Sequence, residues 1–179
     1  MPDVTPATGW RPHIRVKEAT ATNADPLGEI SEEDVRRYDE DGVVLLKGTF
    51  DQAWLKHLSE QIEVDVANLG PLHMELEEAG QAGRFFFDTF LWTYNAAFKQ
   101  FDFESPAARI AARMMRASKV NVFYDQLLIK EPGTVKRTRW HHDMPYWPLV
   151  GWQVWTIWLA LDRVTKDSGA VEYVRGSPS

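Results

Sequence analysis

Apolar residues recur at helical spacing in two segments near the start of the chain. Ser31 followed by three acidic residues is a helix start and Gly42 is a helix stop, so the pattern predicts a helix ending near Asp41. A second helix is predicted between the capping residue Asp51 and the terminating Gly70. Its apolar stripe consists of Leu55, Leu58, Ile62, Val66 and Leu69. Such stripes are typical of packing surfaces, so we assign both helices to the scaffold.

A third helix is predicted to begin at Ser105-Pro106, a capping serine before a proline at the first helical position. Ile110 and Met114 lie on its apolar face. Its polar face carries Arg109, Arg113 and Arg116. These arginines either form a solvated face or bind an anion, and the pattern favours the solvated face.

Short apolar runs predict strands in the rest of the chain. Residues 43–47 lie between two glycines and are predicted to form a buried strand. The aromatic run 85–92 is interpreted as core, with the wall of a substrate pocket as the alternative. Further strands are predicted over 120–129, 152–161 and 170–174. Both faces of the 152–161 segment are largely apolar, which is typical of a strand buried on both sides.

This order of elements predicts an α+β fold with an antiparallel sheet. We divide the chain into a flexible leader at 1–28 and a single domain at 29–179, in which 29–118 are mainly helical. A complete jelly roll needs more strands than the few recognisable over 119–179. We therefore expect N-terminal helices packed on the first half of a jelly roll whose C-terminal strands are missing.

Composition narrows the classes of function. The net charge is −6 and the pI is near 5.4, so no basic footprint favours a nucleic-acid partner. No apolar run is long enough to span a membrane, and no signal peptide is recognisable. The sequence contains no cysteine, which excludes disulfides and thiolate metal sites and favours a cytoplasmic location.

The strongest chemical signal is the segment 140–147, where His141 precedes Asp143 by two residues. In an extended strand, side chains at these two positions leave on the same face, so both would reach one cation while His142 points away. A histidine and a carboxylate are two of the three ligands in the facial triad that holds non-haem iron(II) and leaves other coordination positions open. The third ligand should be a second histidine, distant in sequence.

The bland alternative is a polar turn between two strands, with Asp143 as the turn-forming residue. The neighbouring rings of Trp140, Tyr146 and Trp147 favour the metal site, because they would exclude water from a reactive centre. No other histidine is an obvious third ligand, and we interpret the others as surface residues. They are His13, His57 and His73.

Several segments resemble the phytanoyl-CoA dioxygenase family of Fe(II)/2-oxoglutarate oxygenases. They are 41–48, 124–134, 140–148, 158–162 and 167–177. The similarity covers about residues 30–179, and the run Trp-His-His-Asp-Met-Pro-Tyr-Trp-Pro around His141 is quite specific in that setting.

The resemblance implies a double-stranded β-helix with helices packed on its outside. His141 and Asp143 would be the first two iron ligands and the catalytic centre. Trp158 matches a position that packs near 2-oxoglutarate, and the resemblance also places Gln126 and Lys130 in the wall of that pocket.

The implied reaction couples oxidative decarboxylation of 2-oxoglutarate to hydroxylation of a C–H bond by O2. The expected substrate is a small organic or lipid-like molecule, because the residues that would line its pocket are aromatic. These candidates are Phe87, Trp92, Tyr146 and Trp147.

In the family, the distal histidine and the basic residue that pairs with the far carboxylate of 2-oxoglutarate belong to later strands. We therefore expect this chain to be the N-terminal part of a longer oxygenase, with weak iron binding and little or no turnover. The alternative is a non-enzymatic binding or assembly module completed by a second chain through strand addition, since half a jelly roll would leave strand edges unpaired.

Overall fold

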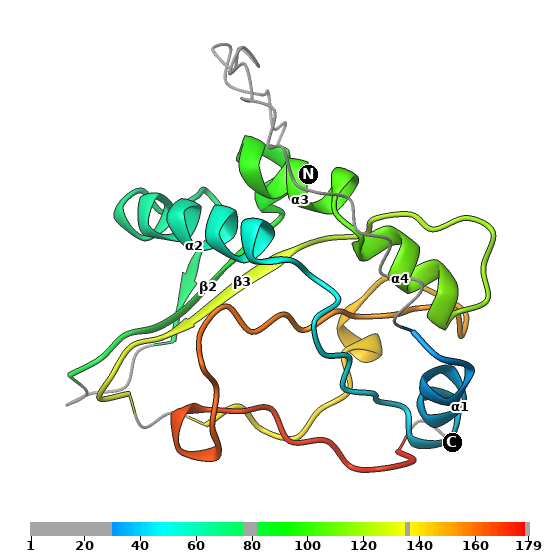
Figure 1. The fold of residues 1–179 in the computed structure, drawn as a ribbon. Coiled ribbons are helices and arrows are strands. Elements are labelled where there is room, and N and C mark those ends of the chain that lie inside the picture. Colours follow the sequence, from blue (N-terminus) through cyan, green and yellow to red (C-terminus); the bar gives the residue numbers. More distant parts are fainter. Residues whose placement is uncertain (1–29, 77–81, 135–136, 178–179) are drawn as a thin grey trace, which may run out of the picture.

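A computed structural model describes residues 30–76, 82–134 and 137–177 (Figure 1). The leader predicted at 1–28 lies outside the described residues. The helices are α1 (Glu32–Asp41), α2 (Gln52–Ala67), α3 (Ala96–Glu104) and α4 (Ala107–Met114). The strands are β1 (Met74–Glu75), β2 (Phe85–Thr89) and β3 (Gln126–Lys130). Helices and antiparallel strands occur together, which confirms the α+β prediction.

The ends of the first two helices follow the local sequence signals. The Ser31 hydroxyl accepts the Asp34 N–H and the Asp34 carboxylate accepts the Ser31 N–H, which is a complete capping box. Gly42 stops α1 in the left-handed conformation, with φ of 75°. Asp51 caps α2 by accepting the Trp54 N–H. Both predicted helices are confirmed because their signals act within one turn of chain.

The helix α3 carries no apolar stripe as clear as those of the other helices, and sequence analysis missed it. Its start is nonetheless local, since the Asn95 side chain accepts the N–H groups of Ala97 and Phe98. At the other end the Ser105 hydroxyl accepts the Ala107 N–H, and the predicted start of the next helix is confirmed, because α4 begins directly after Pro106.

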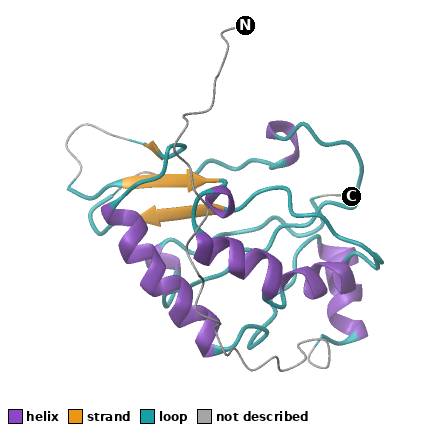
Figure 2. Ribbon diagram, turned by 90° about the horizontal axis from the view of Figure 1, so that it is seen from above, coloured by secondary structure: helices purple, strands orange, loops and turns teal. Residues whose placement is uncertain are grey.

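The sheet has the order β1-β2-β3, and its two faces differ. Phe86 pairs with Ile129 and Asp88 pairs with Leu127, so these side chains share the face that α2 and α3 cover. Figure 1 shows both helices on one side of the strands, and Figure 2 shows the same layer from above. The core on this face comprises Leu58, Leu91, Phe98 and Leu127. The core interpretation of the aromatic run is therefore confirmed for Phe85 and Phe86, which are buried.

A second core lies between α1 and α4. It is built from Ile30, Val35, Ile110 and Met114. The Tyr38 ring meets the edge of Trp155 at 6.0 Å, which brings the 152–161 segment onto this core. Arg175 and Gly176 both bind Asp41, through its carboxylate at 2.5 Å and its carbonyl at 2.8 Å. The first helix and the last described turn are thereby joined.

Four of the predicted strands are wrong or too long in the described residues. Segments 43–47, 152–161 and 170–174 run without a paired strand, and 120–129 is paired only from Gln126 onward. A strand needs a paired backbone as well as a suitable composition, and in the described part of the chain no backbone pairs with these segments.

The 152–161 segment also differs from its prediction in burial. Trp155, Ile157 and Leu159 are partly buried, whereas Trp152 on the opposite face is 94% exposed. The segment therefore packs one face only, and its second apolar face is open. None of the helices that the structure describes is both long and apolar enough to cross a bilayer.

Candidate functional site

The side chains of His141 and Asp143 converge, with Nε2 of the imidazole 3.3 Å from Oδ1 of the carboxylate. The backbone reason differs from the predicted one. Asp143 has α-helical torsion angles, φ −69° and ψ −38°, and it opens the 3-10 turn η3 (Met144–Tyr146). The expected extended strand is therefore wrong at this point, but the turn folds the carboxylate back toward the imidazole and the predicted pair still forms.

The other ring nitrogen of His141 fixes the orientation of the pair. Nδ1 lies 2.7 Å from the carbonyl oxygen of Arg139. A carbonyl only accepts, so Nδ1 carries a hydrogen and Nε2 is the nitrogen left to bind a cation. Histidines that ligate metals usually donate their second N–H in this way. The imidazole is thus oriented as a ligand, with its free nitrogen facing the Asp143 carboxylate.

The spacing of the two donor atoms suits one shared cation. Ligand atoms about 2.1 Å from a metal and separated by about 90–105° lie roughly 3.0–3.3 Å apart. The observed 3.3 Å falls within this range. The donor set, one imidazole and one carboxylate, also fits an iron(II) site. Within the described ranges no third histidine, cysteine, aspartate or glutamate completes a metal-binding group.

Several aromatic rings stand close to the pair. The Tyr146 ring meets the His141 ring edge-on at 6.0 Å. Burial raises the pKa of Tyr124 and of Tyr173, and the Asp143 carboxylate raises both further. The His141 and Asp143 side chains remain 39% and 46% exposed, so the surrounding rings leave the donor atoms accessible. Sequence analysis did not single out Tyr124 or Tyr173, although both lie in the segments that carry the resemblance.

One aromatic cluster flanks the site, and we call it the aromatic wall. It consists of Phe90, Phe123, Tyr124 and Trp147. Trp147 meets Tyr124 at 5.6 Å and Phe123 at 5.8 Å, both edge-on. Trp147 follows the η3 turn directly, so the wall is attached to the same turn that carries Asp143.

Three of the residues predicted for the pocket share one face of the sheet. Phe87 pairs with Leu128 and the neighbouring pairs bring in Gln126 and Lys130, all on the face opposite α2 and α3. The chain around Gly169 also approaches this face, whereas Leu159 and Leu161 pack on the core of the α2–α3 face. A Cβ added to Gly169 would lie 3.9 Å from Cδ of Lys130, so this segment approaches β3 closely.

The environment of Lys130 suits an anionic ligand. Its Nζ lies 4.5 Å from the centre of the Phe85 ring and 3.5 Å from the Thr138 hydroxyl. Burial lowers the pKa of this lysine. No carboxylate of the described residues forms an ion pair with it. A partly buried ammonium with a ring and a hydroxyl as neighbours is available to a carboxylate from solution.

A family model described as phytanoyl-CoA dioxygenase (PhyH) matches residues 38–178, which is most of the chain. The chain belongs to the phytanoyl-CoA dioxygenase family. The match includes the His141–Asp143 pair, β3 and the segment around Trp158. No curated protein and no solved structure matches the chain.

Two of the residues predicted for the phytanoyl-CoA dioxygenase site are less closely associated with the pair. Trp158 is 47% exposed, on the open face of the 152–161 segment. The Trp92 ring packs against Phe103 of α3 at 5.8 Å, near the helical layer. The structure thus groups Tyr146 and Trp147 with the histidine–aspartate turn, and it groups Phe87 with Gln126 and Lys130 on the sheet.

The other described histidines do not join the pair. His57 was interpreted as a surface residue, and this is wrong, because it is partly buried beside Trp54 at 5.9 Å and its Nε2 is buried. Its place on the inner side of α2 follows from the stripe that buries Trp54 and Leu58. His73 is exposed, as predicted, and its ring binds the Gly70 carbonyl. His13 lies outside the described residues.

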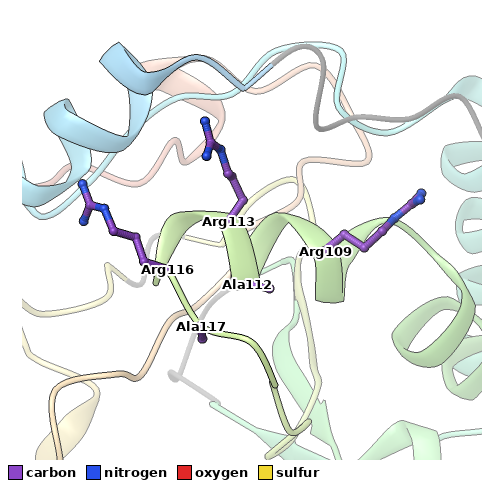
Figure 3. Close-up of a pocket in the computed structure, with 5 residues that line it drawn as sticks. All are labelled: Arg109, Ala112, Arg113, Arg116 and Ala117. Atoms are coloured by element: carbon purple, nitrogen blue, oxygen red, sulfur yellow. The ribbon is translucent and has the colours of Figure 1, made fainter.

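Three arginines line an open hollow (Figure 3): Arg109 and Arg113 of α4, and Arg116 just after its end. Arg113 and Arg116 point toward α1, where they pair with Glu32 at 2.5 Å and Asp39 at 2.7 Å, and Arg109 points away. The solvated-face interpretation fits these exposed ion pairs. This hollow is unrelated to the His141–Asp143 pair, and we assign it no role in the phytanoyl-CoA dioxygenase site.

Proposed function

We propose that this phytanoyl-CoA dioxygenase family member serves Fe(II)- and 2-oxoglutarate-dependent oxygenation of a small organic or lipid-like substrate. The observation that carries the proposal is the paired His141 Nε2 and Asp143 Oδ1, with Nδ1 of the same ring bound to a carbonyl. The donor pair by itself suits several divalent metals. The choice of iron among them is supported by family membership.

His141 and Asp143 would hold the iron. When bound, the iron would supply the activation of O2, and oxidation of 2-oxoglutarate would drive that activation. The ammonium of Lys130 would bind a carboxylate of 2-oxoglutarate, and Gln126, on the same sheet face at the other end of β3, offers an amide for further hydrogen bonds. Trp158 would pack against the same cofactor. These residues would bind and orient, and the rings around the pair would exclude water from the reacting C–H bond once substrate covers them.

Substrate would meet an aromatic surface near the pair. Tyr146 and Trp147 lie next to the metal turn, and Phe87 lies on the sheet face that carries Lys130. Trp92 would belong to a more remote edge of this surface, because it packs on α3. Large rings with few charged neighbours favour an apolar or mixed substrate.

The proposed enzyme requires a second layer of strands, which would form a double-stranded β-helix. The 152–161 segment supports this proposal, because it is extended, unpaired in the described residues and apolar on its open face. A second layer of strands packed on that face would cover Trp152 and Trp158. The third metal ligand would come from the added layer.

The experiment is an anaerobic loading of the 179-residue chain with Fe(II), followed by addition of 2-oxoglutarate and O2 and measurement of succinate. Because the described residues provide two metal ligands, we expect at most slow succinate formation that His141→Ala abolishes and His142→Ala leaves unchanged. Rapid turnover would contradict the expected weak activity. Slow turnover that survives His141→Ala would contradict the proposed centre.

A second candidate function is a non-enzymatic assembly module that accepts a strand from another chain. The observation in its favour is the 152–161 segment, which is unpaired in the described residues and has an open apolar face where Trp152 is 94% exposed. Light scattering over a concentration series tests it. The module predicts self-association that Trp152→Lys weakens and that Leu45→Lys, at another exposed apolar position, does not. A monomer at every concentration would contradict assembly through a second copy.

A further inference from the structure

Asp125 joins two distant parts of the chain through two different acceptors. Its backbone carbonyl accepts the Phe90 N–H at 3.0 Å, and its carboxylate Oδ2 accepts the Trp92 N–H at 3.0 Å. The turn that follows β2 is therefore fastened to the residue that precedes β3. Both bonds end on one residue, so a change at Asp125 acts on the whole turn.

The fastened turn holds an uncommon backbone conformation. Phe90 has φ of 57°, in the left-handed region that side chains with a Cβ rarely adopt. Such a residue keeps its conformation only when its surroundings hold it. The hydrogen bonds to Asp125 on either side of Leu91 provide this restraint, together with the burial of Leu91 itself.

The restrained Phe90 ring belongs to the aromatic wall. It packs on Tyr124 at 5.5 Å and on Phe123 at 6.5 Å, and those two rings in turn contact Trp147. Trp147 donates its backbone N–H to Met144, and Tyr146 donates to Asp143. A continuous set of contacts therefore leads from Asp125 to the turn that carries the Asp143 carboxylate.

The carboxylate of Asp125 lies among other acidic groups. Burial and, to a smaller extent, the Asp88 charge on β2 raise the pKa of Asp125 to about 6, although backbone N–H groups that include that of Trp92 lower it in part. On α3, burial and the Asp125 charge together raise the pKa of Asp102 to about 7. The Asp125 charge also contributes to the raised pKa of Tyr94, which is raised chiefly by burial and follows η2 (Leu91–Thr93). Asp65 on α2 is close enough to Asp88 that the Asp88 charge adds to the effect of burial on the pKa of Asp65.

Asp125 and Asp102 each have one carboxylate oxygen without a hydrogen-bond partner among the described residues. These atoms are Oδ1 of Asp125 and Oδ2 of Asp102, and both are buried. A proton on either carboxyl would relieve the repulsion between them. The charge that accepts the Trp92 N–H is therefore set by the protonation of this pair.

We propose that Asp125 is a positioning residue, which through Phe90 and Trp92 holds the aromatic wall against the His141–Asp143 turn. The inference about the wall rests on the contacts alone, and its consequence for catalysis rests on the proposed function. Asp125 itself touches neither the metal pair nor a substrate in this account; it acts by fixing the rings beside them.

The test compares near-ultraviolet circular dichroism of the aromatic side chains across pH 5 to 8 in four proteins. In the wild type, we expect a spectral step near the pH at which Asp125 titrates, about 6. Asp125→Asn keeps an oxygen for the Trp92 N–H but cannot titrate, so the step should disappear while the spectrum remains. Asp125→Ala removes the acceptor and should collapse the wall signal. Asp65→Asn is the matched control, because the pKa of Asp65 is also about 6 but its carboxylate bonds the Asn95 side chain and not the N–H groups of Phe90 and Trp92.

The step should persist in Asp65→Asn. A step that persists in Asp125→Asn, or that disappears in Asp65→Asn, would overturn the assignment. Mn²⁺ affinity separates this inference from the proposed function. Weaker Mn²⁺ binding in Asp125→Ala than in Asp125→Asn links the wall to the metal turn. An altered wall spectrum with no Mn²⁺ binding in any of the proteins would overturn the metal centre and leave Asp125 as the residue that positions the wall.

Discussion

The ammonium of Lys130 lies 4.5 Å from the centre of the Phe85 ring, on the sheet face that α2 and α3 leave uncovered. Both residues belong to one pair of the β2–β3 ladder, so the backbone register itself places the charge beside the ring. A cation held in this way keeps its position without a carboxylate partner, which leaves it available to an anionic ligand.

Replacing Lys130 by methionine should abolish binding of 2-oxoglutarate while leaving Mn²⁺ binding at His141 and Asp143 unchanged. The long apolar stem would still cover Phe85, so stability should change little. Calorimetric titration of the Mn²⁺-loaded chain with 2-oxoglutarate measures the effect. Lys166→Met is the control, because that lysine is exposed and pairs with Glu172. Equal losses in both variants would show that general charge, rather than this position, governs binding.

Because Phe86 and Phe87 lie on different faces of β2, replacing them should lower the stability by very different amounts. Phe86 is fully buried under the helices, so Phe86→Ala should lower the free energy of unfolding by about 3–5 kcal/mol. Phe87 lies on the other face and is only partly buried, so Phe87→Ala should cost much less stability. Urea denaturation of both variants gives the comparison. A larger loss for Phe87 would mean that the assigned faces are reversed.

Stability should fall as the pH rises through the range from about 4 to 7. Burial raises the pKa values of Asp65 and Asp125 to about 6 and that of Asp102 to about 7. In this range the folded chain binds more protons than the unfolded chain, so protonation favours folding and its contribution is lost as pH increases. Denaturation at pH 5 and pH 8 measures the slope.

Asp65→Asn isolates one part of this pH effect. The amide is neutral at every pH, so the variant should gain on the order of 1–2 kcal/mol over the wild type at pH 8, roughly half of that at pH 5, and nothing only below the unfolded pKa of about 4. Asp167→Asn, at an exposed position, serves as the control. A variant that is less stable than the wild type at both pH values would contradict the assigned cost of burying this charge.

The elements that could be predicted from sequence depend on local chemistry. Ser31 and Asp51 cap helices with their own side chains, and Gly42 ends a helix by its own conformation, so each signal needs only a few residues. Strands depend on a second segment. The 152–161 residues have strand composition, but in the described part of the chain no backbone pairs with them, and composition gives no information about pairing partners.

The candidate site shows the same division. The spacing of His141 and Asp143 was enough to predict that the two side chains meet, although the backbone achieves it with a 3-10 turn instead of a strand. The grouping of Gln126 and Lys130 with Phe87 depends on the ladder register, which sequence patterns left open. Asp125 was not predicted to have a role, because its two acceptor bonds join residues more than thirty positions apart in the chain.

The most direct measurement of the central claim is the affinity of the chain for Mn²⁺, followed by electron paramagnetic resonance of the free ion under anaerobic conditions. We expect the chain to bind Mn²⁺ weakly and one-to-one. This binding should be lost in His141→Ala and in Asp143→Ala and retained in His142→Ala. Binding that is the same in all four proteins, or that disappears only with His142, would contradict a metal centre built on this pair.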